Sequence, residues 1–117
     1  MAKAAKFGLR ISKPWGESAR YDMVIETGGR FLRVQIKSTM YLRSEGYYLC
    51  GVRPCTTSKT YCRGEFDFVT AYVMPEDVWY INPAKVVVYG KRTGILLYTC
   101  NPTGKYEAYR EAWDRLR

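Results

Sequence analysis

The stretch YDMVIETGGRFLRVQIKST, residues 21–39, alternates apolar and polar positions on both sides of a Gly-Gly pair. Alternation with a period of two is typical of a half-buried β-strand. Glycine accepts the positive φ angles of a two-residue primed turn, so Gly28 and Gly29 can join two such strands. The pattern predicts an antiparallel hairpin in which Thr27 faces Arg30.

The two faces of this hairpin differ in character. In the predicted register Asp22 lies opposite Gln35, and Lys37 follows on the same face two residues later. An acid, an amide and an amine therefore meet at one end of the hairpin, close enough to share one metal ion or one phosphate oxygen. The opposite face is apolar and must lie against a core; it carries Met23, Ile25, Leu32, Val34 and Ile36.

The remainder of the chain continues in short strand-like runs and ends in a helix-like one. Apolar and aromatic runs bounded by turn residues predict strands within residues 45–53, 65–74 and 77–83. The run PAKVVVYG is compatible with a short helix, because proline suits a first helical position, and with an edge strand, because valine favours strands. The C-terminal spacing predicts a packing helix whose apolar face carries Tyr106, Tyr109, Trp113 and Leu116.

Length and composition bound the class of protein. With 117 residues the chain suits one domain, residues 1–117, around a single modest core. Apolar runs are too short to span a membrane or to act as a secretory signal, so we expect an intracellular protein in a reducing compartment. A formal net charge of +8 indicates a polyanionic partner, which charge alone leaves open as DNA, RNA or an anionic lipid surface.

The chain contains no histidine. This removes the usual general base of Ser and Cys triads and the commonest transition-metal ligand. Hydrolysis of a phosphodiester then depends on hard-metal chemistry, in which carboxylate and carbonyl oxygens hold Mg²⁺ and a lysine stabilises charge or the attacking water. The polar end of the predicted hairpin offers these groups.

The order of these motifs resembles that of a known nuclease family. RYDMVIETGGRFLRVQIKST is similar to the core of the PD-(D/E)xK nuclease superfamily, in which an Asp ends one strand and Glu or Gln, any residue, and Lys follow. The segments KPWGESARYD, YCRGEFDFVTAYV, VWYINP and YEAYREAWDRL extend the resemblance to the branch that contains a group I intron-encoded homing endonuclease. The resemblance implies a restriction-endonuclease-like α/β fold, a mixed central β-sheet flanked by helices, with a short or truncated N-terminal helix.

The resemblance also implies roles for single residues. Asp22 would be the metal-bridging carboxylate and Gln35 a neutral ligand or water-positioning group. Lys37 would be the electrostatic partner of nucleophile and phosphate, and the Ile36 carbonyl a further metal ligand. Mg²⁺ is the expected ion, with Mn²⁺ as a possible substitute. A glutamate on the N-terminal helix usually completes such a site, but MAKAAKF contains no acid, so Glu17 in the PWGES loop is a candidate substitute.

Basic and hydroxyl residues near the hairpin are candidates for DNA contacts. They interleave with aromatic residues, as backbone contacts and occasional base stacking require, although a solvated loop of a basic protein shows the same pattern. The candidates are Arg20, Arg33, Ser38, Arg43, Arg53, Lys59 and Arg63. Glu65 and Asp67 either support the metal site or simply solvate the entry to a strand.

The cysteines allow two interpretations. A Cys₄ zinc site is one, but the spacing lacks the paired short knuckles of zinc modules, so reduced and mostly buried thiols are favoured. The residues concerned are Cys50, Cys55, Cys62 and Cys100.

We therefore expect a Mg²⁺-dependent DNA endonuclease of the homing-endonuclease type, cytoplasmic in a prokaryotic or phage system. One site cuts one strand, so double-strand cleavage requires a homo-dimer or homo-tetramer. Two alternatives stay open. One is a non-catalytic DNA-binding module of the same fold, which the missing helix glutamate favours. The other is a structure-specific nuclease or Holliday junction resolvase.

Overall fold

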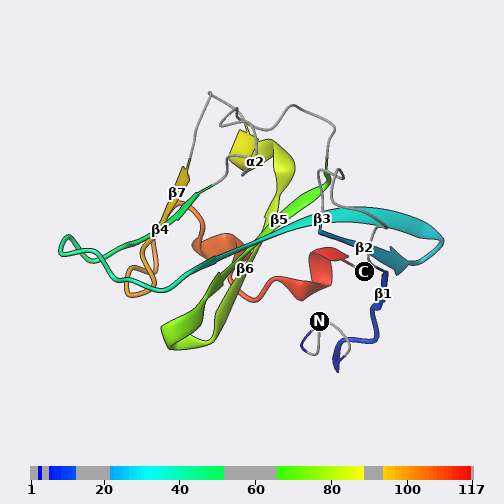
Figure 1. Cartoon of the computed structure of the whole chain (residues 1–117), viewed down its shortest axis with the longest axis horizontal. Helices are drawn as coiled ribbons and strands as arrows, with labels where there is room; N and C mark the ends of the chain where they lie inside the picture. Colours follow the sequence, from blue (N-terminus) through cyan, green and yellow to red (C-terminus); the bar gives the residue numbers. More distant parts are fainter. Residues whose placement is uncertain (1–2, 4–5, 13–21, 52–65, 89–93, 117) are drawn as a thin grey trace.

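A computed structural model of the chain describes residues 3, 6–12, 22–51, 66–88 and 94–116. Five strands form one sheet in the order β1-β2-β3-β5-β6, and a second sheet pairs β4 with β7 at the opposite end from β1 (Figure 1). The strands are β1 (Arg10–Ser12), β2 (Met23–Thr27), β3 (Arg30–Thr39), β4 (Tyr48–Gly51), β5 (Phe68–Val73), β6 (Val78–Pro83) and β7 (Gly94–Leu97). Within the described ranges, no helix has the length and apolar character needed to cross a membrane.

Strands β2 and β3 form the hairpin that the sequence predicts. Gly28 and Gly29 have φ angles of 53° and 77°, and Thr27 faces Arg30. These positive φ angles are the reason for glycine at both turn positions. The predicted apolar row is buried or half-buried, which confirms the register: Met23, Ile25, Leu32, Val34 and Ile36.

Strand β3 is central and changes its partner along its length. Its first half pairs antiparallel with β2, and its second half, from Val34 to Thr39, pairs parallel with β5. Strands β5 and β6 are antiparallel and are joined by a 3-10 turn, η1 (Met74–Glu76), which ends at Asp77 with a φ of 51°. The mixed sheet and the three predicted strands are therefore confirmed. The undecided run after β6 contains a short helix, α2 (Ala84–Val88).

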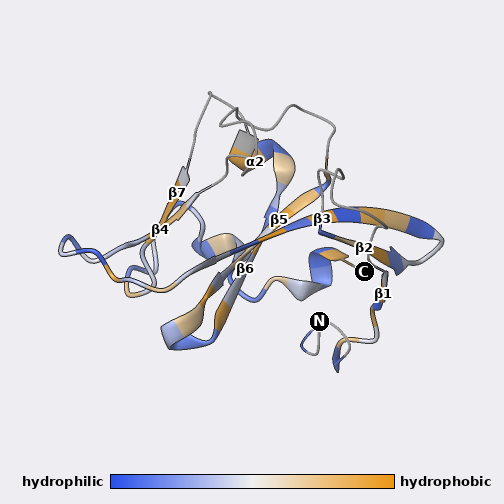
Figure 2. Ribbon diagram, in the orientation of Figure 1, coloured by the Kyte–Doolittle hydropathy of each residue, from blue (hydrophilic) through white to orange (hydrophobic). Residues whose placement is uncertain are grey.

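The larger sheet is covered by apolar side chains on both faces, and hydrophobic positions recur along its central strands (Figure 2). On one face, residues of β2 and β3 pack against the C-terminal segment, with Met23, Ile25, Leu32, Val34, Ile81, Trp113 and Leu116 in this cluster. On the other face, β5 and β6 pack under β4 and β7, with Tyr48, Cys50, Val69, Ala71, Tyr80, Ile95 and Leu97 in that cluster. The core is thus divided between two faces.

The prediction of a continuous C-terminal helix is wrong. Two short 3-10 turns, η3 (Glu107–Tyr109) and η4 (Trp113–Leu116), are separated by extended Arg110 and by Glu111, whose φ is 50°. The predicted burial is correct in part, because Tyr106, Trp113 and Leu116 are buried and Tyr109 is half-buried.

The free edge of β6 explains why this segment is not helical. Arg110 forms a β-bridge with Tyr80. Glu111 donates its N–H to the Trp79 carbonyl at 2.7 Å, and its carboxylate accepts the Trp79 N–H at 2.7 Å. These bonds satisfy backbone groups that an uncovered edge would expose. A helix of so few residues is marginal in isolation, so the edge contacts decide the conformation.

A hydrogen-bond network fixes the C-terminal segment to the sheet. Tyr80 is 0% exposed, and its hydroxyl donates to a Glu107 carboxylate oxygen at 2.6 Å. Arg110 donates to the Thr99 carbonyl at 2.7 Å and to Glu107 at 3.4 Å. Burial, and then the hydrogen bond to Glu107, raise the pKa of Tyr80 above its ordinary value.

Tyr80→Phe should destabilise the protein and flatten its alkaline pH dependence. The variant leaves Glu107 without this donor, so we expect the free energy of unfolding at pH 7 to fall by about 1–2 kcal/mol. The unfolded tyrosine ionises near its ordinary pKa of 10.0, whereas folded Tyr80 stays protonated. Its contribution is therefore fully present below that pH and is lost as the pH rises above it. Urea unfolding at neutral and alkaline pH measures both effects. An equally steep alkaline loss in the variant and the wild type would contradict the assignment.

Candidate active site

The β2–β3 ladder stops at Met23 and Val34, one position before Asp22 would face Gln35. Asp22 leaves the ladder there: its N–H donates to the Val34 carbonyl at 2.9 Å, and its Oδ2 accepts the Ile36 N–H at 2.7 Å. Asp22 is therefore hydrogen-bonded to the backbone of both neighbours of Gln35 in the sequence. The structure places the acid beside the Gln35 backbone, but without the direct cross-strand pair that the register predicts.

The same hydrogen bond orients the Ile36 peptide groups. In an extended strand the N–H and C=O of one residue point to the same edge. Because the Ile36 N–H meets Asp22 Oδ2, the Ile36 carbonyl also points to the edge that β2 has left. Oxygen atoms of Asp22 and Ile36 therefore face one region of the sheet edge.

Gln35 and Lys37 lie on the part of β3 that pairs with β5. Gln35 pairs in register with Val69, and Lys37 with Ala71. The Gln35 side chain is 7% exposed, Lys37 is half-buried, and Asp22 is exposed. Side chains two residues apart on one strand are separated by roughly 7 Å. The three groups thus run from an exposed carboxylate through a buried amide to a partly buried amine.

Strand β4 covers the end of this row. Thr39 Oγ1 donates to the Leu49 carbonyl at 3.0 Å, and Cys50 is fully buried. Burial raises the pKa of the Cys50 thiol to about 11, while the positive charge of Lys37 acts in the opposite direction. Burial thus favours the neutral form of this thiol, as expected for a packed core cysteine.

The other cysteines of the alternative zinc site are less informative. Cys100 is exposed, and Cys55 and Cys62 lie outside the described residues. In the described part of the chain, Cys50 is buried, Cys100 is exposed, and no three ligating side chains gather, so the zinc interpretation has no support there.

The donor set at the edge of the sheet suits a hard divalent cation. Asp22 offers carboxylate oxygen, Gln35 amide oxygen and Ile36 carbonyl oxygen, and these are the ligand types that Mg²⁺ prefers. In the described ranges, no three Asp, Glu, His or Cys side chains gather to hold a metal ion. Glu17, the candidate additional ligand, lies outside these ranges. The donors fit the cation in type, and among the described ones Asp22 carries the negative charge.

Arg33, a predicted DNA contact, is engaged with the entry to β5. Its N–H donates to Asp67 Oδ2 at 2.8 Å and its Nε to the same oxygen at 3.4 Å. Asp67 in turn donates its N–H to the Arg33 carbonyl at 2.8 Å. Of the two acids considered at this strand entry, Asp67 therefore joins β5 to β3, and Glu65 lies outside the described residues.

The remaining predicted DNA contacts are only partly placed. Ser38 and Arg43 are exposed, the first on β3 and the second in the turn that precedes β4. The Arg43 carbonyl accepts the Gly46 N–H at 2.9 Å, which closes this turn. The other candidates lie outside the described residues: Arg20, Arg53, Lys59 and Arg63.

Sequence reasoning missed one polar residue of the covered face. Asn82 is 0% exposed and lies in one register row with Val69 and Gln35 across β6, β5 and β3. Its Nδ2 donates to the Tyr80 carbonyl at 3.5 Å, and its Oδ1 has no hydrogen-bond partner in the described structure. An amide inside the apolar run VWYINP was the available signal, because a buried polar group usually needs a partner.

A mixed sheet with an acid where one strand begins and Gln-x-Lys on the next defines a restriction-endonuclease-like fold. The family model of the PD-(D/E)XK endonuclease matches residues 1–115, and the chain belongs to this family. Among matching solved structures is that of a bacterial homing endonuclease, I-Ssp6803I, with 29% sequence identity and a TM-score of 0.79. The match covers 98% of this chain and 80% of that one. No curated protein matches the sequence.

These comparisons agree with the fold and with the chemistry of the edge. Family membership makes the chain a DNA nuclease, and PD-(D/E)XK nucleases generally use divalent metal ions. The similarity to the homing endonuclease structure confirms the predicted restriction-endonuclease-like fold with its mixed sheet, and helices are few and short in the described residues. The predicted resemblance is therefore correct at the level of family and fold.

Asp67→Ala should destabilise the protein more than Arg33→Ala. The first change removes the acceptor of both a backbone N–H and a guanidinium, so we expect a loss of about 2 kcal/mol in the free energy of unfolding. The second keeps the backbone bond and removes the partly exposed ion pair with Asp67, a contact that contributes about 1 kcal/mol or less. Urea unfolding of both variants measures the difference. Equal losses would show that the backbone bond to Asp67 contributes little.

Proposed function

We propose that this chain is a homing-endonuclease-like DNA endonuclease that uses Mg²⁺, with Asp22, Gln35 and Lys37 as its catalytic residues. The observation that carries the proposal is the 2.7 Å hydrogen bond from Ile36 N–H to Asp22 Oδ2, which holds the carboxylate beside the Gln-x-Lys strand. The family and the similarity to a homing endonuclease support it.

The proposed metal ligands are the oxygens at the sheet edge. Asp22 would provide the anionic ligand, while Gln35 Oε1 and the Ile36 carbonyl would provide neutral ones, with Glu17 as a further acid. A bound Mg²⁺, or Mn²⁺ in its place, would polarise the scissile phosphate and lower the pKa of an attacking water. Because Gln35 replaces a carboxylate, metal affinity would depend strongly on Asp22.

The protein's own contribution follows from burial and charge. The nearly buried Gln35 side chain has few accessible rotamers, so its amide oxygen would be held in place before substrate binds. The half-buried Lys37 ammonium would offset negative charge that develops on the phosphate, and partial exclusion of water strengthens such an interaction. Exposed Ser38 and Arg43 would contact DNA phosphates beside the site.

We also propose that residues 1–117 act as one nuclease domain within a homo-oligomer. One site cuts one strand, so cleavage of both strands by a single complex needs two copies of the site. A two-fold arrangement would place two copies on opposite strands. Dimers and tetramers both satisfy this requirement.

One observation favours a second candidate, a non-catalytic DNA-binding module of the same fold. Among the described residues, the candidate site contains the single carboxylate of Asp22, and no cluster of three acidic or other ligating side chains is found there. Weak charge neutralisation would lower metal affinity, which would leave DNA binding as the remaining activity.

Nicking of supercoiled plasmid at low salt tests the proposed activity. The wild type should nick with Mg²⁺ or Mn²⁺ and not with EDTA. Asp22→Asn keeps the side-chain shape but removes the anionic ligand, and Lys37→Ala removes the ammonium. We expect each to lower the rate at least about 100-fold, because each removes an interaction with developing charge.

DNA affinity in Ca²⁺, measured by fluorescence anisotropy, controls for binding. Both variants should bind DNA within about threefold of the wild type, since one phosphate contact contributes modestly. If all three proteins bind alike and none nicks, the chain is a binding module and the proposed activity is wrong.

Gln35→Glu provides an independent test of the metal ligands. A second carboxylate beside Asp22 strengthens binding of a hard cation, so the Mg²⁺ concentration for half-maximal nicking should fall about tenfold. Gln35→Leu, with similar volume and no oxygen, should raise it or abolish nicking. Calorimetric titration of Mn²⁺ without DNA gives a second readout. An unchanged metal requirement in both variants would exclude position 35 from the metal site.

A further inference from the structure

The β4–β7 ribbon has one face that nothing covers in the described structure. Its inner face packs on the sheet through Tyr48, Cys50, Ile95 and Leu97. On the outer face Leu49 and Leu96 are cross-strand partners, and each is 40% exposed. The rings of Tyr47 and Tyr98 continue this face, with centroids 5.5 Å apart. We call this exposed apolar surface the outer face of the ribbon.

Tyr41 extends the outer face beyond β4. Leu42 forms an antiparallel bridge with Tyr48, and Arg43 donates its N–H to the Tyr47 carbonyl at 2.7 Å. Continued by one residue, this antiparallel pairing sets Tyr41 beside Leu49. Tyr41 is 77% exposed. A large aromatic side chain therefore projects from an apolar surface.

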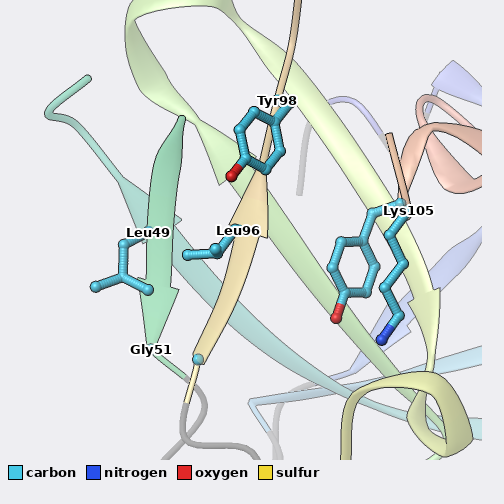
Figure 3. A pocket seen from close by; sticks show the side chains of 7 residues that line it. Leu49, Gly51, Leu96, Tyr98 and Lys105 are labelled. Carbon is cyan, nitrogen blue, oxygen red and sulfur yellow. The ribbon is translucent and has the colours of Figure 1, made fainter. Parts of the chain in front are cut away.

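The same surface also contains a hollow. Figure 3 shows the cavity, of about 620 Å³, with side chains from both strands and from the C-terminal segment around it. Its lining includes Leu49, Gly51, Gly94, Leu96, Tyr98 and Lys105. Gly51 and Gly94 are cross-strand partners, so two adjacent positions lack side chains. A volume in this range accommodates an aromatic side chain.

Packing within the ribbon explains why one of the two positions in the hollow is glycine but not why the other is. A Cβ at Gly94 would lie 3.0 Å from Leu49 Cδ1 and 3.2 Å from the Cys50 carbonyl oxygen, so packing within the ribbon explains this glycine. A Cβ at Gly51 would meet no atom of the described residues within 4 Å, and Gly51 is not among the glycines with positive φ. Glycine inside a strand often marks the close approach of a ligand or another backbone. Gly51 therefore points to an occupant of the hollow.

We propose that the outer face docks a second copy of this chain, with Tyr41 of each copy seated in the hollow of the other. A projection and a hollow on one surface are self-complementary under a two-fold axis, as an isologous dimer requires. Exposed apolar patches mark interfaces, and an aromatic residue in a pocket is a frequent anchor. The inference rests on the homo-oligomer of the proposed function and gives it a surface.

The charge distribution favours a protein occupant over DNA. Among the described residues that line the hollow, Lys105 is the charged one, and the others are leucine, tyrosine and glycine. DNA binding surfaces need several cations along the backbone path. The net charge of +8 opposes association of two copies, so added salt should strengthen docking by screening that repulsion. Salt weakens DNA binding instead, and this difference separates the two occupants.

Sedimentation equilibrium without DNA tests the proposal. The wild type should reach at least twice the 13.6 kDa chain mass, more completely at higher salt. Tyr41→Asp removes the projecting ring and Gly51→Val fills the hollow, so each should raise the dissociation constant at least about 30-fold. Phe31→Asp is the matched control, because Phe31 is 69% exposed at the tip of the β2–β3 hairpin, away from the outer face. Its mass should equal that of the wild type.

A mixture of the two docking variants gives a stricter test. Tyr41→Asp copies keep the hollow and Gly51→Val copies keep the ring, so one of the two contacts can form between them. The mixture should associate more tightly than either variant alone. Circular dichroism melting of each variant reports whether it folds, and both positions have room for the change.

Two further measurements distinguish a failure of the docking proposal from a failure of the catalytic proposal. Asp22→Asn should keep the wild-type mass, and Tyr41→Asp should still nick plasmid while it forms linear product more slowly. A monomeric wild type at about 100 µM would overturn the docking surface. So would folded variants that keep the wild-type mass, or variants that change only the affinity and salt dependence of DNA binding.

Discussion

The hydrogen bond from the Ile36 N–H to Asp22 Oδ2 lies where the pairing of β3 passes from β2 to β5. Strand β2 pairs with β3 up to Val34, and β5 pairs with it from Val34 onward. Backbone N–H groups need partners, and Ile36 faces the side that β2 has already left. A carboxylate supplies the missing acceptor. The acidic end of the candidate active site is therefore also what completes the hydrogen bonding of the central strand.

The covering of both sheet faces determines the environment of the rest of the site. Gln35 and Lys37 lie on the face that β4 and β7 cover, so the amide is buried and the ammonium partly so. Charges in such surroundings interact more strongly than in water. The exposed Asp22 lies at the edge that β2 has left. The candidate site thus extends from an exposed carboxylate, past the oxygen atoms at the edge of β3, to a low-dielectric interior.

The sequence predicts the hairpin well because its determinants are local. The glycine turn and the alternating pattern define the Thr27–Arg30 register without reference to distant residues. The end of the chain shows the opposite case. Helical spacing correctly identifies most of the buried aromatic residues, but the bonds from Glu111 to Trp79 decide the backbone conformation. Those partners are distant in sequence, so local propensity cannot reveal them.

In the candidate site and on the outer face of the ribbon, too, contacts between residues distant in sequence could not be predicted from local patterns. A local hairpin places Asp22 beside the backbone on either side of Gln35, whereas the bond from Arg33 to Asp67 depends on the parallel pairing of two distant strands. In the run Tyr47 to Gly51 each position is apolar or small, so alternation cannot tell which face is buried. The pairing with β7 decides this, and it leaves Leu49 and Gly51 on the exposed side. In the assembly that we propose, a second copy of the chain covers this exposed apolar side, which would connect the composition of the ribbon to cleavage of both strands.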